Sequence, residues 1–304
     1  MLRHLNPLEY VAIGFIKFNI ESPVNIGAGE IGVRRLFLKD EDVLIIPSST
    51  WKGAFRSLTE KIAKSIEDDG FLDELSLLAV KSYREGKSGI FYRIDNGIID
   101  EMVKVIKGEK SKLFNQYNRE IINQIAIKFK FTKFEELIEG SNREFLEKIT
   151  ELILALNCPI SKLYGNNIIS GKIRFLDTLL RAGRYALNIR PGIAIDRASG
   201  KVKEDALFFI ESATSNEGIY LNIIADNLMP NLKESKLFSL TLKAIIELGL
   251  EIGARKSVGL GKLSLNTKES YWYVVRLHDR LKLGNPFKYG EKLSIRDFID
   301  WLWT

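Results

Sequence analysis

The chain has 304 residues, of which 45% are hydrophobic and 28% charged, a balance typical of a folded globular protein. Lysine plus arginine exceed aspartate plus glutamate by 45 − 39 = 6, which weakly favours an anionic partner such as nucleic acid. The single cysteine, Cys158, excludes an intrachain disulfide, and two histidines, His4 and His278, argue against a zinc site. Because no apolar run is long enough for a membrane span and no secretory signal is visible, we expect a cytoplasmic protein without membrane contact.

The N-terminal part predicts strands followed by a helix. Residues 11–20 alternate in apolar character, as a strand does, and a glycine-rich turn follows at 25–32. A hairpin is expected around Glu41 and Asp42. Pro47 then stops the strand, and the Ser and Thr residues after it offer N-caps to a helix with one apolar face. The positions on that face are Trp51, Ala54, Phe55, Leu58, Ile62 and Ile66.

The middle of the chain changes character twice. Residues 70–155 show helical periodicity with little strand signal except in GIFYRI, which predicts a mostly helical insertion. A turn or short helix is expected at 158–165, and residues 190–206 predict a loop or a protruding hairpin rich in charge. The segments that predict the next strands are 171–177, 207–212 and 218–226.

The C-terminal part predicts a helix from Pro230 to about Ile252, ended by a glycine-rich segment at 253–262 that leads into a strand. One more strand and a closing helix are expected in the tail. The order of elements favours an α+β fold with an antiparallel, ferredoxin-like sheet, whose duplication stays an open alternative. We expect one elaborated domain over 1–304. Its parts are a core at 1–69 and 156–270, the helical insertion at 70–155, and a C-terminal strand and helix at 271–304.

The first candidate site is the start of the helix after Pro47. Amides at a helix N-terminus are unpaired and bind phosphate readily. Lys52 and Arg56 lie four residues apart and outside the apolar stripe, so they would share a face near those amides. Ser48, Ser49, Lys52 and Arg56 are therefore candidate phosphate ligands, and a plainly capped surface helix is the alternative.

The second candidate site is the glycine-rich segment. Its glycines allow turns with positive φ and a close approach of a ligand to the backbone, while its cations suit phosphates. A helix C-cap followed by a basic turn is the alternative. The candidate RNA-binding residues here are Gly253, Arg255, Lys256, Ser257, Gly259 and Gly261.

The third candidate site is the charged segment at 190–206. Its basic residues are Arg190, Arg197, Lys201 and Lys203, of which the last three are its candidate RNA-binding residues, and Ile193 and Ile195 alternate with the charges. A protruding basic hairpin with apolar side chains can wedge between bases. A solvated surface turn is the alternative.

Support for catalysis is slight. The chain contains no serine-triad order, zinc-protease helix, P-loop or dinucleotide-binding turn. His4 and His278 each stand alone, and Asp40, Asp177 and Asp196 are scattered. We therefore expect no metal site and no cofactor.

Six motifs between residues 11 and 263 carry a family resemblance. They are NIGAGEIG at 25–32, IIPSSTWKGAFRSL at 45–58, CPISKLYG at 158–165, KIRFLD at 172–177, IAIDRASGKVKEDALFFIE at 193–211 and GARKSVGLGKL at 253–263. In this order they resemble the RAMP superfamily (repeat-associated mysterious proteins) of CRISPR systems, and most closely the backbone subunits of type III effector complexes. The insertion and the residues after about 265 carry no such motif.

The resemblance implies an RNA-recognition-type core whose copies or relatives stack along CRISPR RNA. It implies that the helix start at Ser48 to Arg56 and the loop with Arg255 and Lys256 bind the guide backbone. The hairpin around 197–203 would be a thumb that wedges into the guide–target duplex. The partners implied are CRISPR RNA, target RNA and other RAMP-type subunits.

One departure from the family bears on cleavage. Members that cut their target carry an aspartate between the glycine turn and the IPSS helix, and alignment through Asp40 puts Arg34 at that place. An arginine cannot serve as base or metal ligand, although it can hold phosphate. We therefore expect a subunit that binds RNA without cutting it. An endoribonuclease of target or guide-precursor RNA, with Glu30 or Asp40 in place of the missing acid, and an unrelated α+β enzyme stay open as alternatives.

Overall fold

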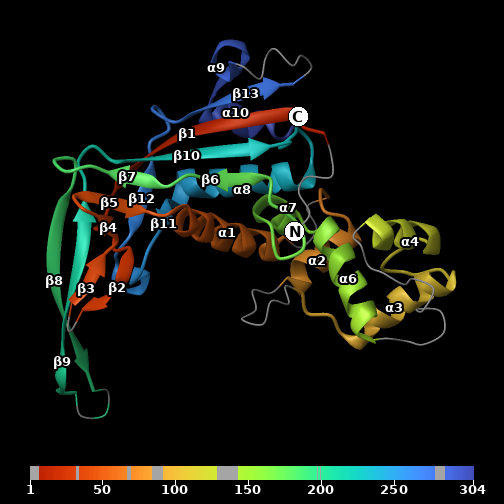
Figure 1. The fold of residues 1–304 in the computed structure, drawn as a ribbon, viewed down its shortest axis with the longest axis horizontal. Helices are drawn as coiled ribbons and strands as arrows, with labels where there is room; N and C mark the ends of the chain where they lie inside the picture. The colour runs from red at the N-terminus through yellow and green to blue at the C-terminus, as the bar shows by residue number, and fades with distance from the viewer. Residues whose placement is uncertain are drawn as a thin grey trace. The chain divides into compact units, whose positions relative to one another are not determined.

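The computed structural model describes residues 7–31, 34–66, 70–83, 92–128, 143–196, 198, 200–277 and 285–304. The chain divides into two compact units. The sheet unit comprises Leu8–Thr59 and Ile173–Thr304, and the helical unit comprises Met1–Pro7 and Glu60–Lys172. The predicted α+β class is confirmed by this mixture of antiparallel sheet and helices (Figure 1).

The centre of the sheet unit is a βαββαβ arrangement. Its elements in chain order are β1 (Tyr10–Ile20), α1 (Ser48–Ser65), β6 (Ile173–Phe175), β10 (Ile219–Asp226), α8 (Lys233–Leu248) and β12 (Lys262–Leu265). The strands lie side by side in the order β12-β1-β10-β6, and all three pairings are antiparallel. This order confirms the predicted ferredoxin-like core.

Additional elements widen this sheet to seven strands. The strand β13 pairs with the first half of β1, opposite Tyr10–Phe15, while β12 pairs with its last residues, Phe18–Ile20. The added elements are β11 (Leu250–Glu251), β13 (Tyr271–Arg276), α9 (Pro286–Tyr289), β14 (Glu291–Ser294) and α10 (Ile295–Trp301).

One face of the seven-stranded sheet forms the core of the unit. Phe18 of β1 stacks on Trp51 of α1 with ring centroids 5.5 Å apart, and both are fully buried. Trp272 of β13 stacks on Phe298 of α10 at 4.2 Å. Gly14 makes this possible, because a Cβ there would lie 2.7 Å from the Trp272 indole. The helices α1 and α10 thus cover the same face, and the opposite face of the sheet carries the other half of each strand's residues.

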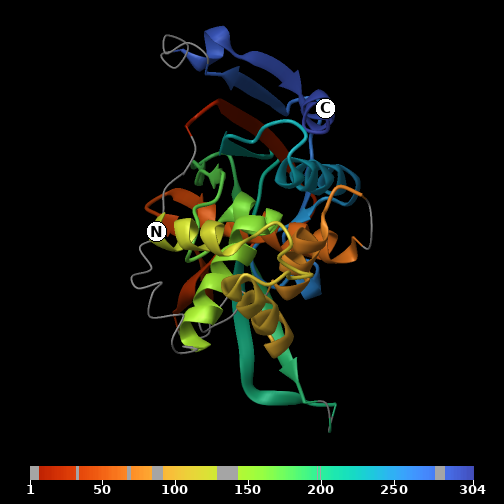
Figure 2. The ribbon, with the colours of Figure 1, turned by 90° about the vertical axis from the view of Figure 1, so that its right-hand side faces the viewer.

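Two smaller sheets complete the sheet unit. A four-stranded sheet has the order β2-β3-β9-β8 and a three-stranded sheet the order β4-β5-β7. Their strands are β2 (Gly27–Ile31), β3 (Arg34–Phe37), β4 (Lys39–Asp40), β5 (Val43–Ile46), β7 (Thr178–Leu180), β8 (Ala186–Ile195) and β9 (Val202–Thr214). The expected hairpin at Glu41 and Asp42 joins β4 to β5. The charged segment at 190–206 belongs to the long β8–β9 hairpin, which extends away from the rest of the unit (Figures 1 and 2).

The helical unit contains α2 (Glu74–Ser82), α3 (Asn96–Lys107), α4 (Arg119–Lys128), α6 (Arg143–Asn157) and α7 (Pro159–Tyr164). Asp73 and Asp95 cap α2 and α3 by accepting amide hydrogen bonds at 2.8 and 2.9 Å. Half of GIFYRI, residues 89–91, lies outside the described residues, and Tyr92 forms an isolated bridge with Tyr83. The expected short helix at 158–165 is α7.

The end of α8 corrects the sequence interpretation. The helix stops at Leu248 rather than at about Ile252, because Gly249 turns the chain with φ 78°. A Cβ on Gly249 would lie 2.4 Å from the carbonyl oxygen of Leu263, so only glycine fits this turn. The next two residues pair with β12 as β11. The glycine-rich segment therefore follows a short strand, and Gly253 does not end the helix.

Candidate functional site

The glycine-rich loop, residues 253–261, is pinned at both ends. Ile252 donates its amide to Gly261 at 2.9 Å, which closes the loop. Ala254 and Gly261 donate to the carbonyl oxygens of Asn25 and Pro23, each at 2.9 Å. The loop is thereby fixed against the turn that follows β1, which lies more than two hundred residues earlier in the chain.

Two of the loop's glycines are required by this packing. A Cβ on Gly253 would lie 2.2 Å from the Asn25 carbonyl oxygen, and one on Gly261 would lie 2.0 Å from that of Ile252. Both residues also have positive φ, of 77° and 82°. Gly253 and Gly261 thus set the shape of the loop. Its tip, formed by Lys256, Ser257 and Gly259 around a short 3₁₀ turn, is exposed.

Arg255 at the start of this tip reaches the β8–β9 hairpin. Its guanidinium lies over the ring of Phe208 in β9, 4.3 Å from the ring centroid. The guanidinium of Arg35 in β3 lies 4.9 Å from the same centroid. Across the hairpin, a Cβ on Gly192 would lie only 2.2 Å from the ring of Phe208, so a glycine at this position leaves room for the ring. One ring therefore joins three segments that are distant in sequence.

Strand register shows which other side chains share this surface. Arg190 is paired with Ile210, and Arg35 is also in register with Ile210, so both arginines lie on the side of the sheet that carries Phe208. We call this surface the arginine face: Arg35, Arg190 and Arg255 around Phe208. Glu211 lies on the opposite side, where its carboxylate accepts the Phe37 amide at 3.0 Å.

The opposite side of the hairpin carries an aliphatic face, formed by Leu187, Ile189, Ile193 and Leu207. Their side chains are 36 to 51% exposed, and Ile195 near the tip is 58% exposed. At the tip, Asp196 accepts the Ala198 amide through Oδ1 at 2.9 Å and so caps the turn, as a local Asx motif. Of the three cations expected to bind RNA here, Lys201 is exposed, whereas Arg197 and the side chain of Lys203 lie outside the described residues.

The start of α1 is partly occupied by a carboxylate. Asp177 accepts the amide of Ser48 at 2.6 Å, and hydrogen bonds from the amide and the hydroxyl of Ser48 lower the pKa of Asp177. Asp177 therefore caps this helix start, and the amide and hydroxyl of Ser48 are engaged within the protein. Ser49 is exposed, and its amide has no acceptor among the described residues. A phosphate at this helix start would meet Ser49 rather than Ser48.

Lys52 and Arg56 lie on the next turn of α1, as expected. Both side chains are half-buried. Burial, and secondly the positive charge of Arg56, lower the pKa of Lys52. No carboxylate in the described part of the chain pairs with Lys52. Lys52 and Arg56 are half-buried and repel each other, so a nearby anion stabilises their charged forms.

The helix start and the glycine-rich loop are anchored to the same end of β1. Trp51 packs on Phe18, and Phe18 and Ile20 pair with Leu265 and Leu263 of β12, immediately after the loop. The loop in turn contacts the hairpin through Arg255. The structure thus gathers all three predicted sites at one end of the sheet unit (Figure 1).

The sequence interpretation missed Phe208, Arg35 and Gly192. The available signal was the Arg34-Arg35 pair next to the glycine turn and the glycine in RPGIA. Neither signal indicates which face of a strand a side chain occupies, and that depends on pairings between distant segments.

Arg34 and Asp40, two of the positions considered for catalysis, lie on different strands. Arg34, where an acid was expected, is exposed in β3, and Asp40 is exposed in β4. The side chain of Glu30, like His4 and His278, lies outside the described residues. Within the described ranges no three His, Cys, Asp or Glu residues are grouped so that they could hold a metal ion.

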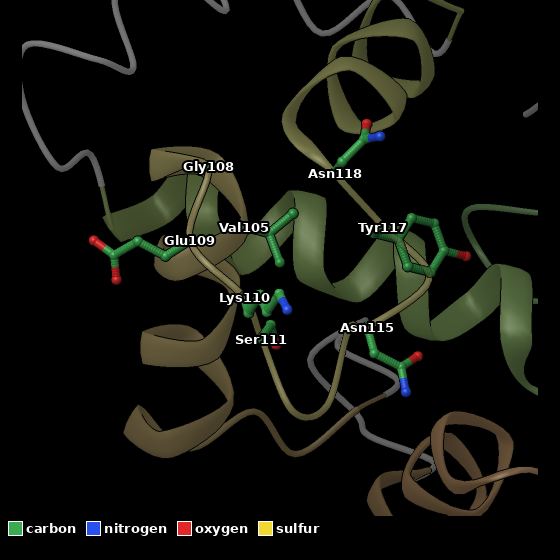
Figure 3. Close-up of a pocket in the computed structure, with 8 residues that line it drawn as sticks. All are labelled: Val105, Gly108, Glu109, Lys110, Ser111, Asn115, Tyr117 and Asn118. Carbon is green, nitrogen blue, oxygen red and sulfur yellow. The ribbon is translucent and has the colours of Figure 1, made fainter.

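The helical unit has a surface hollow of about 300 Å³ beside the end of α3 (Figure 3). Its charged lining residues are Glu109 and Lys110, and Glu109 points away from Tyr117 and Asn118. The remaining lining is Val105, Gly108, Ser111 and Asn115. Because it offers no acid–base pair with a nucleophile, this hollow is a weaker candidate than the arginine face.

A comparison with protein families distinguishes a RAMP protein from an unrelated α+β enzyme. The model of the RAMP superfamily matches residues 17–264, well over half of the chain. The chain belongs to the RAMP superfamily. Membership implies a CRISPR-associated, RNA-binding function, with RNA and CRISPR complexes as the general partners. No curated protein matches the chain. None of the helices that the structure describes has the length and apolar character needed to cross a membrane.

Proposed function

We propose that this RAMP protein is an RNA-binding subunit of a type III CRISPR ribonucleoprotein, which holds CRISPR RNA by its backbone and helps to recognise target RNA in antiviral defence. The observation that carries the proposal is the arginine face, where guanidinium groups from distant segments converge on Phe208. Guanidinium groups match phosphate oxygens in geometry and keep their charge. Phosphate contacts are independent of base sequence, which suits a subunit whose guide changes while base pairing supplies specificity.

The guide backbone, in this proposal, follows one end of the sheet unit. It crosses the arginine face and the tip of the glycine-rich loop and reaches Ser49 and Lys52 at the start of α1. A phosphate there relieves the repulsion between Lys52 and Arg56. We call this path the guide groove. Other RAMP-type subunits are the expected neighbours along the same RNA.

The β8–β9 hairpin is the proposed thumb. Its aliphatic face is exposed, and its tip carries Lys201. An apolar wedge on a basic support can separate stacked bases and hold the adjacent phosphates. The hairpin would therefore enter the duplex of guide and target, at a place set by the subunit's position on the guide.

We further propose that this subunit does not cut RNA, because Arg34 occupies the place of the expected acid. Measuring target cleavage by complexes that carry Asp40→Ala or Glu30→Ala tests this point. An unchanged cleavage pattern supports the proposal, whereas loss of one specific cut means that the subunit is an endoribonuclease.

Salt dependence tests the guide groove itself. Each phosphate contact contributes about 0.7 to the slope of log affinity against log salt for single-stranded RNA. Lys52→Ala and Arg255→Ala should each make this slope shallower by roughly that amount. Lys128→Ala, an exposed lysine of the helical unit, is the matched control and should leave the slope unchanged. RNA affinity that does not change with salt would contradict binding through phosphate contacts.

A further inference from the structure

The face of the seven-stranded sheet opposite α1 and α10 carries two ordered rows of side chains. Residues that are paired across strands lie on the same face, so the register defines each row. The first row crosses five strands, from β6 through β10, β1 and β13 to β14. It consists of Arg174, Ile224, Ile13, Tyr273 and Lys292. The second row consists of Asn222, Phe15 and Tyr271.

Aromatic rings occupy the middle of this open face. Phe15 stacks on Tyr271 with centroids 5.2 Å apart, and Tyr273 meets Tyr271 edge-on at 5.8 Å. Phe287 of α9 meets Tyr273 edge-on at 5.4 Å and is 54% exposed. We call these four rings the aromatic platform. Three of the rings, Phe15, Tyr271 and Tyr273, are half-buried and lie outside the core, which is on the other side of the sheet; Phe287 packs α9 against Phe15 and Tyr273.

The charges on the open face leave an excess of positive charge. Lys292 lies over the ring of Tyr271, 4.1 Å from its centroid, and no carboxylate among the described residues pairs with it. Among the described residues, two carboxylates near this face are already engaged, because Glu269 pairs with Lys17 at 2.8 Å and Asp226 with Arg174 at 2.9 Å. A polyanion with flat, apolar groups complements such a surface better than an acidic or aliphatic protein segment does.

We propose that this open face binds single-stranded RNA, with two or three unpaired bases stacked on the aromatic platform. Open sheet faces with aromatic side chains bind unpaired bases in this way, and stacking is tolerant of base identity. An incoming base takes the place of Lys292 over Tyr271, and the released amine pairs with a phosphate. That the ligand is RNA rests on the proposed function, but the platform is a different site from the guide groove.

The platform is separate from the guide groove. Phe15 lies five residues before Ile20 in β1, which corresponds to about 17 Å along the strand. The start of α1 also lies on the covered face of the sheet, where Trp51 packs on Phe18. An RNA segment on the platform is therefore one that has left the guide groove, or a second strand.

Binding of a short fluorescein-labelled RNA of mixed sequence, followed by anisotropy, tests the platform. Tyr271→Thr and Tyr273→Thr keep a β-favouring residue but remove a ring, and each should weaken binding about 5- to 150-fold, the range expected for one stacked base. Tyr271→Phe is the matched control and should bind like the wild type, since it keeps the ring. Circular dichroism and thermal melting check that each variant is folded.

Two results would overturn the inference. The first is that folded Tyr271→Thr and Tyr273→Thr proteins bind the RNA as tightly as the wild type does. The second is that they bind RNA normally but no longer associate with a protein subunit of the complex, which would make the face a protein-docking surface. The variant Arg255→Gln separates the two proposals, because a failure to weaken RNA binding there counts against the guide groove and leaves the platform unaffected.

Discussion

The ring of Phe208 should organise the arginine face, and replacing it with leucine tests this role without removing a charge. A cation–π contact at an exposed site contributes about 0.5–1 kcal/mol. Phe208→Leu removes two such contacts, from Arg35 and Arg255, which together amount to about 1–2 kcal/mol. If the arrangement is retained in the complex, RNA affinity should fall by about 5- to 30-fold.

Anisotropy with guide-length RNA, measured over a range of salt concentrations, separates positioning from charge. Phe208→Leu should lower affinity at every salt concentration and leave the slope unchanged, whereas Arg255→Gln should make the slope shallower. Phe208→Tyr keeps the ring and serves as the matched control. Gly192→Ala should act like Phe208→Leu, because its Cβ would displace the ring. Wild-type affinity in Phe208→Leu would show that the ring does not position the arginines for RNA, and so would a change of slope equal to that of Arg255→Gln.

Three further predictions concern single groups. Burial and the charge of Arg56 lower the pKa of Lys52, whereas a bound phosphate would raise it, so RNA binding should weaken as pH rises toward the ordinary lysine value of 10.5. Lys52→Arg should flatten this pH profile. Identical profiles for the two proteins would contradict a role of Lys52 in phosphate binding. Asp177→Ala should lower the melting temperature at neutral pH. The difference in melting temperature from the wild type should disappear as pH falls below 3.8, the ordinary pKa of an aspartate, and through the lowered pKa of Asp177. A difference that persists in acid would exclude the capping charge as its cause. In denaturant unfolding, Gly259→Ala should lower the free energy of unfolding by about 1–2 kcal/mol, because of its positive φ alone. Gly261→Ala should lower it clearly more, because its Cβ would lie 2.0 Å from a backbone oxygen. Equal losses would mean that the loop is not packed as described.

The ferredoxin-like core could be predicted from the sequence because its signals are local. Alternation in β1 and the apolar stripe of α1 each follow from neighbouring residues, and their order restricts the topology. The three candidate sites were also visible as local patterns of glycine, serine and cations. What joins them, the end of β1 and the ring of Phe208, follows from pairing between distant strands and has no local signal.

The end of α8 shows the limit of a local pattern. Gly249 and Gly253 are both plausible C-caps by residue type, and both adopt positive φ. The helix ends at Gly249 because of the carbonyl oxygen of Leu263, while Gly253 faces that of Asn25. These contacts come from segments far away in the chain, so the choice between the two glycines is made by tertiary structure.

The aromatic platform is a similar case. The run SYWYVV predicts a strand with Trp272 on one face and two tyrosines on the other. Which face is covered depends on α10, whose Phe298 stacks on Trp272. The half-buried tyrosines lie beside Phe15, on the face away from α10, because of the register in which β1 pairs with β13.

The proposal that this RAMP protein holds CRISPR RNA can be tested by purifying it with its natural partners and sequencing the RNA that remains bound. We expect guide RNAs that share repeat-derived ends and differ in their internal sequences, and a loss of this RNA from the complex when Lys52 and Arg255 are both replaced by alanine. Absence of RNA, or a population of unrelated cellular RNAs, would contradict it.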